Sequence, residues 1–142
     1  MAKLQNHKPY REGRHQTFVS NEKKCTHIAN NPDKNMVRQF RVDGDLVPKT
    51  APESRCDFLL LNDDKENAYY IELKGGDIGK AIDQIECTIQ KFHNEITSYQ
   101  IHRHIVYSSA NTHDIKSAKV VRWKAKHGRT AIIERHKLPV TI

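Results

Sequence analysis

Two short apolar runs in the middle of the chain predict a β-hairpin. The first run, 56–61, contains one charged residue, Asp57, and the second, 68–73, contains Glu72. The polar segment 62–67 between them has the character of a hairpin turn. If that turn is symmetric, Asp57 and Glu72 lie directly opposite each other on antiparallel strands.

An amphipathic helix is expected immediately after the hairpin. Gly75 and Gly76 free the backbone, and Asp77 is a residue type that caps helix N-termini. The apolar residues that follow recur at the helical period, within an arc of about 100°, the width of a core-facing stripe. These residues are Ile78, Ala81, Ile82, Ile85, Ile89, Phe92 and Ile96.

Weaker patterns on both sides complete an α/β order. Residues 1–16 lack periodicity and are expected to form a basic, flexible N-terminal arm, which leaves 17–142 as a single domain. The further elements expected are a helix from Ser20 to about Ala29, a strand within 36–47 with a turn at Gly44, a strand over 101–107, a helix from Thr112 to about Lys126 that ends at Gly128, and a strand over 130–133. This order predicts a central mixed sheet flanked by helices, with an αβββαβ core.

Composition places the protein among globular proteins. Hydrophobic residues make up 37% and charged residues 29%. No apolar run approaches the roughly 18 residues that span a bilayer, and the N-terminus lacks the apolar stretch of a secretory signal. The three cysteines form no CxxC pair, so we expect reduced thiols and a cytoplasmic protein.

The charge balance favours a polyanionic partner. Lys and Arg number 24 against 17 Asp and Glu, a net charge of +7, and basic residues concentrate in 1–16 and 116–137. Such surfaces bind phosphates through ion contacts and counterion release. Nucleic acid is therefore the expected partner, although the same surplus occurs in small proteins that do not bind it.

The hairpin itself carries the candidate chemistry. Directly opposed residues on antiparallel strands have Cβ atoms about 4.5–5.5 Å apart, so Asp57 and Glu72 would repel each other. Lys74, two residues beyond Glu72, leaves the same face of the sheet. The other face would carry an apolar layer made of Cys56, Phe58 and Leu60 against Leu73, Ile71 and Tyr69. Buried carboxylates need a neutralising cation, and oxygen ligands favour Mg²⁺ or Mn²⁺.

Simpler interpretations remain open for each of these residues. A hairpin with a salt bridge at its rim is common, and a Glu-x-Lys tripeptide occurs by chance. The nine histidines form no recognised metal or catalytic spacing. Asp45 is the first candidate to extend the acidic cluster, although Asp-Gly and Gly-Asp sequences favour a turn. Trp123 projects among lysines on a helical wheel and is expected to pack rather than to stack on a base.

The arrangement of Asp57, then Glu72-Leu73-Lys74, then the helix from Asp77 resembles the PD-(D/E)xK nuclease superfamily, over roughly residues 36–110. Cys56 replaces the proline of that motif. The resemblance implies a restriction-endonuclease-like fold in which Asp57, Glu72, Leu73 and Glu22 bind the metal, Glu22 from the first helix. It also implies catalytic roles for Asp57, Glu72, Lys74 and Gln84, the last on the helix after the motif.

The sequence thus predicts a Mg²⁺- or Mn²⁺-dependent endonuclease that hydrolyses phosphodiester bonds in DNA, and a homodimer if both strands of a duplex are cut. The lysines beside Gln84 and the basic C-terminal helix would contact the nucleic acid. The residues expected to do so are Lys80, Lys91, Lys119, Arg122 and Lys126. The alternatives are a non-catalytic nucleic-acid-binding or protein-interaction module with the same fold, and an RNA endonuclease.

Overall fold

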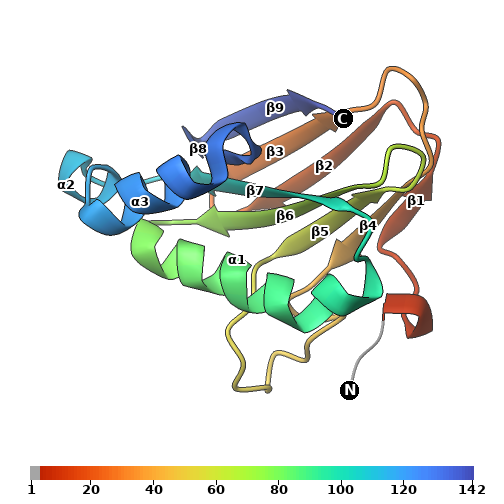
Figure 1. Cartoon of the computed structure of the whole chain (residues 1–142), viewed down its shortest axis with the longest axis horizontal. Coiled ribbons are helices and arrows are strands. Elements are labelled where there is room, and N and C mark those ends of the chain that lie inside the picture. Colours follow the sequence, from red (N-terminus) through yellow and green to blue (C-terminus); the bar gives the residue numbers. More distant parts are fainter. Residues whose placement is uncertain (1–3) are drawn as a thin grey trace.

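A six-stranded mixed sheet forms the centre of the computed structural model, which describes residues 4–142 (Figure 1). Its spatial order is β1-β4-β5-β6-β7-β8. Neighbours from β1 to β6 are antiparallel, and β6, β7 and β8 are parallel. The strands are β1 (Arg11–Gly13), β4 (Val37–Arg41), β5 (Phe58–Asn62), β6 (Asn67–Lys74), β7 (Gln100–Tyr107) and β8 (Ala131–Arg135). The expected α/β class with a mixed sheet is confirmed.

The β5–β6 hairpin has the predicted register. Asn62 pairs with Asn67 at the turn, and Phe58 pairs with Ile71 at the other end. Glu66 has a φ of 53°, which lets the chain reverse before β6. Both strands are almost wholly buried, because helices cover one face of the sheet and a second sheet covers the other. A continuous apolar run is what two covered faces require.

Helix α1 (Ile78–Phe92) lies across one face of the large sheet (Figure 1). The Asp77 side chain accepts a hydrogen bond from the Lys80 N–H, which confirms the predicted N-cap. The buried residues of α1 include the predicted stripe up to Phe92. A 3₁₀ turn, η2 (His93–Glu95), then ends the helix, so Ile96 is buried from a position beyond it.

The helix expected from Thr112 to about Lys126 is instead two helices, α2 (Thr112–Ile115) and α3 (Ala118–His127). The helical conformation is interrupted at Ser117, which has an extended backbone. Its side chain caps α3 by accepting a hydrogen bond from the Val120 N–H. Gly128 ends α3, as predicted, and a 3₁₀ turn, η3 (Gly128–Thr130), leads into β8. Trp123 is buried against the core, as expected.

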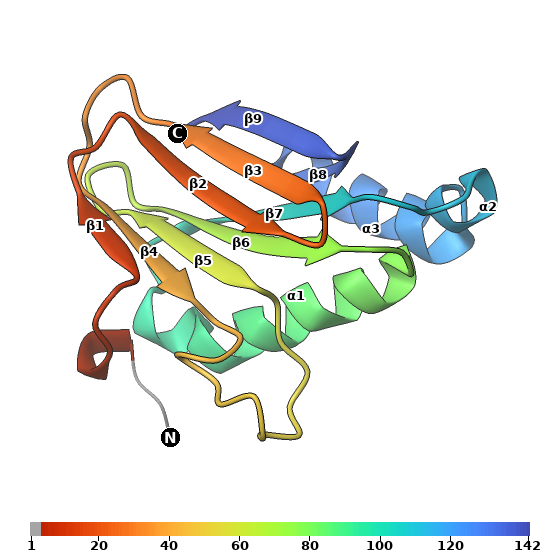
Figure 2. The same cartoon turned by 180° about the vertical axis from the view of Figure 1, so that it is seen from behind.

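A second, three-stranded sheet covers the opposite face of the large sheet (Figure 2). It contains β2 (Thr17–Glu22), β3 (Cys25–Asn30) and β9 (Lys137–Thr141). The helix predicted from Ser20 to Ala29 is therefore wrong, and with it the helical start of the αβββαβ core. The chain reverses at Lys23 and Lys24, whose φ angles of 51° and 62° make a tight turn without glycine or asparagine.

The expected N-terminal arm contributes structure to the large sheet. A 3₁₀ turn, η1 (Leu4–Asn6), places Leu4 in the core, and β1 pairs with β4 at the sheet edge. The part of the arm formed by residues 1–3 lies outside the described residues.

Apolar side chains form two layers, one on each face of the large sheet. The layer under the helices includes Phe40, Leu59 and Tyr70, and the layer between the two sheets includes Phe18 and Ile71. Among residues 4–142, no helix is long and apolar enough to cross a membrane.

Candidate active site

Asp57 and Glu72 lie together at the end of the β5–β6 hairpin, deep in the fold. Asp57 immediately precedes β5, and its exposed fraction is 5%, while that of Glu72 is 0%. The backbone N–H of Leu73 donates to Asp57 Oδ2 at 2.8 Å, which fixes the carboxylate against β6. Among the described residues, no N–H or hydroxyl group donates to either carboxylate oxygen of Glu72, and the Asp57 carboxyl group is close enough to share a proton with it. A buried acceptor in that condition is costly.

Burial raises the pKa of both carboxyl groups, and a neighbouring acid adds to each shift. Burial is the largest cause of the raised pKa of Glu72, to about 9, and the charge of Asp57 adds to it. Burial also raises the pKa of Asp57, to about 6, with a further contribution from the charge of Glu22, while the Leu73 N–H opposes the shift. A divalent cation between the carboxylates would reverse this preference for the protonated form.

Lys74 is the cation nearest to Glu72. Its Nζ lies 4.0 Å from Glu72 Oε2, at the limit of an ion pair, and donates to Gln84 Oε1 at 2.8 Å. Gln84 is on α1, on the same face of the sheet, and its Nε2 donates to the Arg55 carbonyl at 3.0 Å. Gln84 therefore links Lys74 to the segment that leads into Asp57.

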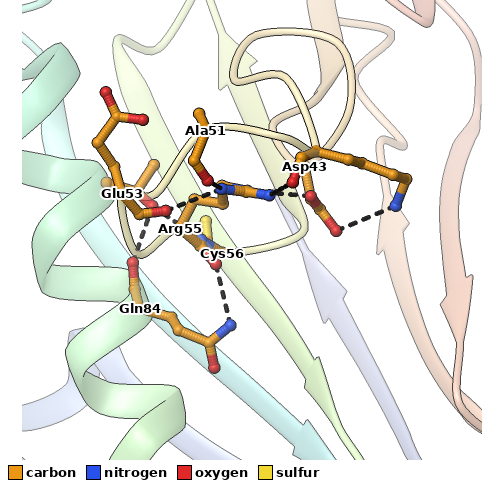
Figure 3. A network of polar contacts seen from close by, with 8 residues as sticks. Asp43, Ala51, Glu53, Arg55, Cys56 and Gln84 are labelled. Carbon is orange, nitrogen blue, oxygen red and sulfur yellow. Dashed lines mark hydrogen bonds and ion pairs between the residues drawn. The ribbon is translucent and has the colours of Figure 1, made fainter.

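Arg55 holds that segment, residues 42–57, in shape (Figure 3). Its Nε donates to Asp43 Oδ1 at 3.0 Å, and its Nη1 and Nη2 donate to three backbone carbonyls of the same segment. Figure 3 shows Arg55 between Asp43 on one side and Gln84 of α1 on the other. Thr88 of α1 adds a second attachment, because its Oγ1 accepts from the Cys56 N–H at 2.8 Å. The position of Asp57 is thus set by bonds on both sides of it.

The hydrogen bond between Thr88 and Cys56 corrects one part of the prediction of which residues lie on each face of the sheet. Phe58, Leu60, Tyr69, Ile71 and Leu73 do form the layer between the sheets, as expected. Cys56 was expected in that layer, but it belongs to the layer under the helices. Regular pairing begins only at Phe58, so the alternation of faces does not extend back to residue 56.

Glu22 approaches the carboxylates from an element other than the predicted one. It is exposed at the end of β2, not on a helix, and its charge raises the pKa of Asp57. The turn of the same hairpin brings Lys23 close enough to lower the pKa of Asp57 and of Glu72. The small sheet therefore adds one acidic and one basic side chain beside the predicted pair.

The remaining predicted residues are distributed unevenly around this centre. Lys80 and Gln84 line one cavity beside Arg55, whereas Lys91 pairs with Glu53 at 3.4 Å. Asp45 is exposed in the turn at Gly44 and belongs to neither cavity that adjoins the site, so only its turn role is supported. The others are on α3, where Lys119 pairs with Asp83 of α1 at 2.7 Å and where Arg122 and Lys126 are exposed.

The donor set fits a hard divalent cation only in part. Among residues 4–142, no three His, Cys, Asp or Glu side chains are arranged to hold a metal ion. Both Glu72 oxygens have unmet acceptor capacity among the described residues, and Asp57 adds a carboxylate whose Oδ2 accepts from the Leu73 N–H. The Leu73 side chain is apolar and buried, so only its carbonyl oxygen is a donor. Mg²⁺ is commonly bound by one or two carboxylates, water and substrate phosphates, a pattern these residues satisfy.

Comparison of the chain with protein-family models, with curated proteins and with solved structures found no match. The candidate site therefore rests on the chemistry of its own residues.

Sequence reasoning missed Arg55, Thr88 and Lys23 as members of this site. Arg55 bonds carbonyls of the irregular segment around it, and Thr88 bonds the backbone N–H of Cys56 from α1; neither contact follows a sequence pattern. Lys23 reaches the site only because 17–30 is a hairpin. The lysine pair at positions 23–24, set between two short runs rich in β-branched and aromatic residues, was the one available signal for that hairpin.

Proposed function

We propose that this protein is a divalent-metal-dependent endonuclease that hydrolyses phosphodiester bonds in DNA, with the restriction-endonuclease-like fold that the Asp57, Glu72, Lys74 motif resembles. The observation that carries the proposal is the pair of buried carboxylates, Asp57 and Glu72, with both Glu72 oxygens unpartnered and Lys74 beside them. Stability alone gives no reason to bury two repelling acids, whereas cation binding does.

In this proposal Asp57 and Glu72 hold Mg²⁺ or Mn²⁺. When bound, such a cation lowers the pKa of water and draws negative charge from a phosphate oxygen. Asp57 is kept in place by the Leu73 N–H, and Glu72 by its burial in β6. Glu22, which lines the adjoining cavity with Asp57, is proposed to contact the cation through water.

Lys74 acts on the phosphate side of the site. Its ammonium group is held by Gln84 and lies at the limit of ion pairing with Glu72, so its charge is only partly satisfied within the protein. A cation so placed stabilises the charge that develops on the phosphate oxygens, or orients the attacking water. Gln84 is a positioning residue, because its contacts are to Lys74 and to the backbone of Arg55.

Basic side chains on α1 and α3 supply the proposed contacts to the nucleic acid backbone. Lys80, Arg122 and Lys126 are exposed, and none of them forms an ion pair in the part of the chain that the structure describes. Cutting both strands of a duplex requires a second active site, so a homodimer belongs to the proposal.

The direct test is incubation of the purified protein with plasmid, single-stranded and branched DNA, and with RNA, in Mg²⁺, Mn²⁺ or EDTA. We expect metal-dependent cutting of DNA that is abolished in Glu72→Gln and in Lys74→Ala. Lys65→Ala is the matched control, because Lys65 is at the far end of the same hairpin and pairs with Asp33. Its substitution removes the same charge and should leave cutting unchanged.

Other outcomes would reject part or all of the proposal. Binding without cutting on every substrate, whatever the metal, supports the non-catalytic module. Cutting restricted to RNA keeps the site and changes the substrate. Cutting that persists in EDTA, or in Glu72→Gln, rejects the assignment of the carboxylates as metal ligands.

A further inference from the structure

A second cavity adjoins the candidate site on the side of the small sheet. It encloses about 330 Å³, at the lower end of the range for ligand pockets, and Asp57 forms part of its wall. The rest of the lining comes from Tyr10, Val19, Asn21, Glu22, Arg41, Asp43, Lys49 and Phe58. The cavity therefore shares a carboxylate with the site and extends from it between the β2–β3 hairpin and segment 42–57.

Exposed apolar surface concentrates at this cavity. Large hydrophobic side chains are conspicuously exposed at three positions within residues 4–142, namely Tyr10 (50%), Val19 (39%) and Val121 (56%). The first two line the cavity. Tyr10 is held there by its backbone N–H, which donates to the Gln39 carbonyl of β4 at 2.8 Å, and its ring meets Phe58 edge-on at 6.5 Å between centroids.

Arg41 places a planar cation over this aromatic surface. Its guanidinium carbon lies 3.9 Å from the centre of the Tyr10 ring. Three carboxylates share the cavity wall, yet Arg41 forms no ion pair with any described residue. Asp43 is taken by Arg55 and Lys49 instead. The Arg41 charge is therefore available to a ligand.

A stacked tyrosine and guanidinium group, with the Val19 and Phe58 side chains in the same lining, is a chemistry that binds nucleobases. Aromatic rings and arginine planes stack on the faces of unpaired bases without regard to sequence. A base inside a duplex is already stacked and paired, so it cannot enter a cavity of this kind without leaving the helix. A simple phosphate site would use the Arg41 charge but not the exposed ring of Tyr10.

We propose that this cavity binds the base of an unpaired nucleotide next to a phosphate that the cation proposed at Asp57 and Glu72 would contact, so that the substrate is single-stranded or splayed nucleic acid. This inference rests on the proposed nuclease function for the position of the phosphate. Tyr10 and Arg41 supply the stacking planes, and Phe58 lines the cavity beside Tyr10.

The test measures binding without catalysis. Fluorescence anisotropy in EDTA gives the affinity of the full chain for a labelled oligothymidine and for a labelled, fully paired, blunt-ended DNA duplex. We expect Tyr10→Ala to weaken binding of the oligothymidine about ten-fold or more, the loss associated with one stacked base, and to leave duplex binding nearly unchanged. Tyr10→Phe keeps the ring and should retain the affinity.

Arg122→Ala is the matched comparison, because Arg122 is exposed on α3 and forms no cation–π contact with an aromatic ring of residues 4–142. Its loss should weaken both ligands alike, since a backbone contact does not distinguish them. Arg41→Lys keeps the charge and loses the plane, so it should follow Tyr10→Ala. Circular dichroism of each variant establishes that the fold is retained, which the half-exposed position of Tyr10 favours.

The inference is overturned if Tyr10→Ala binds oligothymidine as wild type does, or weakens both ligands equally. Its failure is distinct from that of the proposed function. Metal-dependent cutting of closed duplex that survives Tyr10→Ala would reject the base-binding role of the cavity and leave the proposed nuclease function standing. Selective single-strand binding that depends on Tyr10, with no cutting in any metal, would support the base-binding role of the cavity and reject the proposed hydrolysis.

Discussion

Replacing Glu72 by glutamine should change how the stability of the protein depends on pH. The glutamate is fully buried, both of its oxygens lack partners, and its pKa is raised to about 9 from an ordinary value of 4.5. The folded state thus binds a proton that the unfolded state releases. Glutamine has nearly the same shape and no proton to lose, so the variant removes this linkage.

The sign and size of the effect follow from the two pKa values. A carboxyl group whose pKa is higher in the folded state contributes stability that is complete below the unfolded pKa and is lost as pH rises through the folded pKa. Each pH unit between these values lowers the free energy of unfolding by about 1.4 kcal/mol. Between about pH 6.5 and about pH 8.5, Glu72 alone should therefore remove roughly 3 kcal/mol. Asp57, with a pKa of about 6, has largely completed its own change below this window.

Urea unfolding in EDTA, followed by the fluorescence of the single tryptophan, Trp123, measures the slope directly. Trp123 is buried and donates to Glu86, so unfolding exposes it to water. Wild type should lose stability across the window while Glu72→Gln stays nearly level. Adding Mn²⁺ or Mg²⁺ should raise the free energy of unfolding of wild type, most strongly at high pH, where the cation replaces the lost proton. It should leave the free energy of unfolding of Glu72→Gln unchanged. Glu12→Gln, which removes an exposed carboxylate on β1, should keep the wild-type slope. Equal slopes in wild type and Glu72→Gln would refute the reasoning.

Three further changes test other parts of the structure. Arg55→Lys removes a planar group that bonds Asp43 and three carbonyls, so we expect the free energy of unfolding in urea to fall by about 1–3 kcal/mol. Cutting should be slower, while the affinity for DNA in EDTA stays at the wild-type value. Cutting at the wild-type rate would show that segment 42–57 holds its shape without Arg55. His27 and His104 are buried and hydrogen-bonded to each other at 2.9 Å. Burial lowers the pKa of His27 to about 4, so the unfolded state binds a proton more readily than the folded state. The contribution of neutral His27 to the free energy of unfolding should therefore be complete above about pH 6.5 and should fall as pH drops toward 4. His104→Phe should flatten that acid limb in urea titrations, and an unchanged limb would exclude the pair as its cause. Ser117→Ala removes the N-cap of α3 and should cost about 1 kcal/mol by thermal unfolding, whereas a loss near zero would mean that α3 is held by packing alone.

The elements predicted correctly are those whose own residues determine them. The sequence of helix α1 has an N-cap residue, an apolar stripe of the right width and no competing pattern. The structure confirms the cap and the burial of the stripe up to Phe92. The β5–β6 hairpin has two apolar runs separated by a polar segment of even length, which allows one symmetric register. Local pattern and tertiary packing agree in both cases, so the sequence is sufficient.

The small sheet could not be predicted for a different reason. Its inward positions include Ser20 and His27, which are buried but polar, so no apolar alternation marks the strands. Ser20 Oγ accepts from Gln39 of β4, and His27 Nε2 is hydrogen-bonded to His104 of β7. These partners come from the other sheet, so the burial of Ser20 and His27 depends on contacts that no local window contains.

The candidate site combines both situations. Asp57, Glu72 and Lys74 could be placed because they sit on the predicted hairpin. The second half of the site comes from the β2–β3 hairpin and from segment 42–57, and their side chains could not be placed before the fold was known. Glu22 was assigned to the site on the wrong element, since the chain brings it there by a strand turn and not by a helix.

The arrangement of charge argues for a cation between the acids and against simple electrostatic binding of nucleic acid. A module that binds phosphates by charge needs only its basic surface, and Asp57 and Glu72 would weaken it. Their burial also costs stability as pH rises, as worked out above. Even so, the Leu73 N–H, Gln84 and Arg55 fix the surroundings of these acids through bonds from β6, α1 and segment 42–57. Surroundings so firmly held keep the two acids close together, which supports the proposed cation between them.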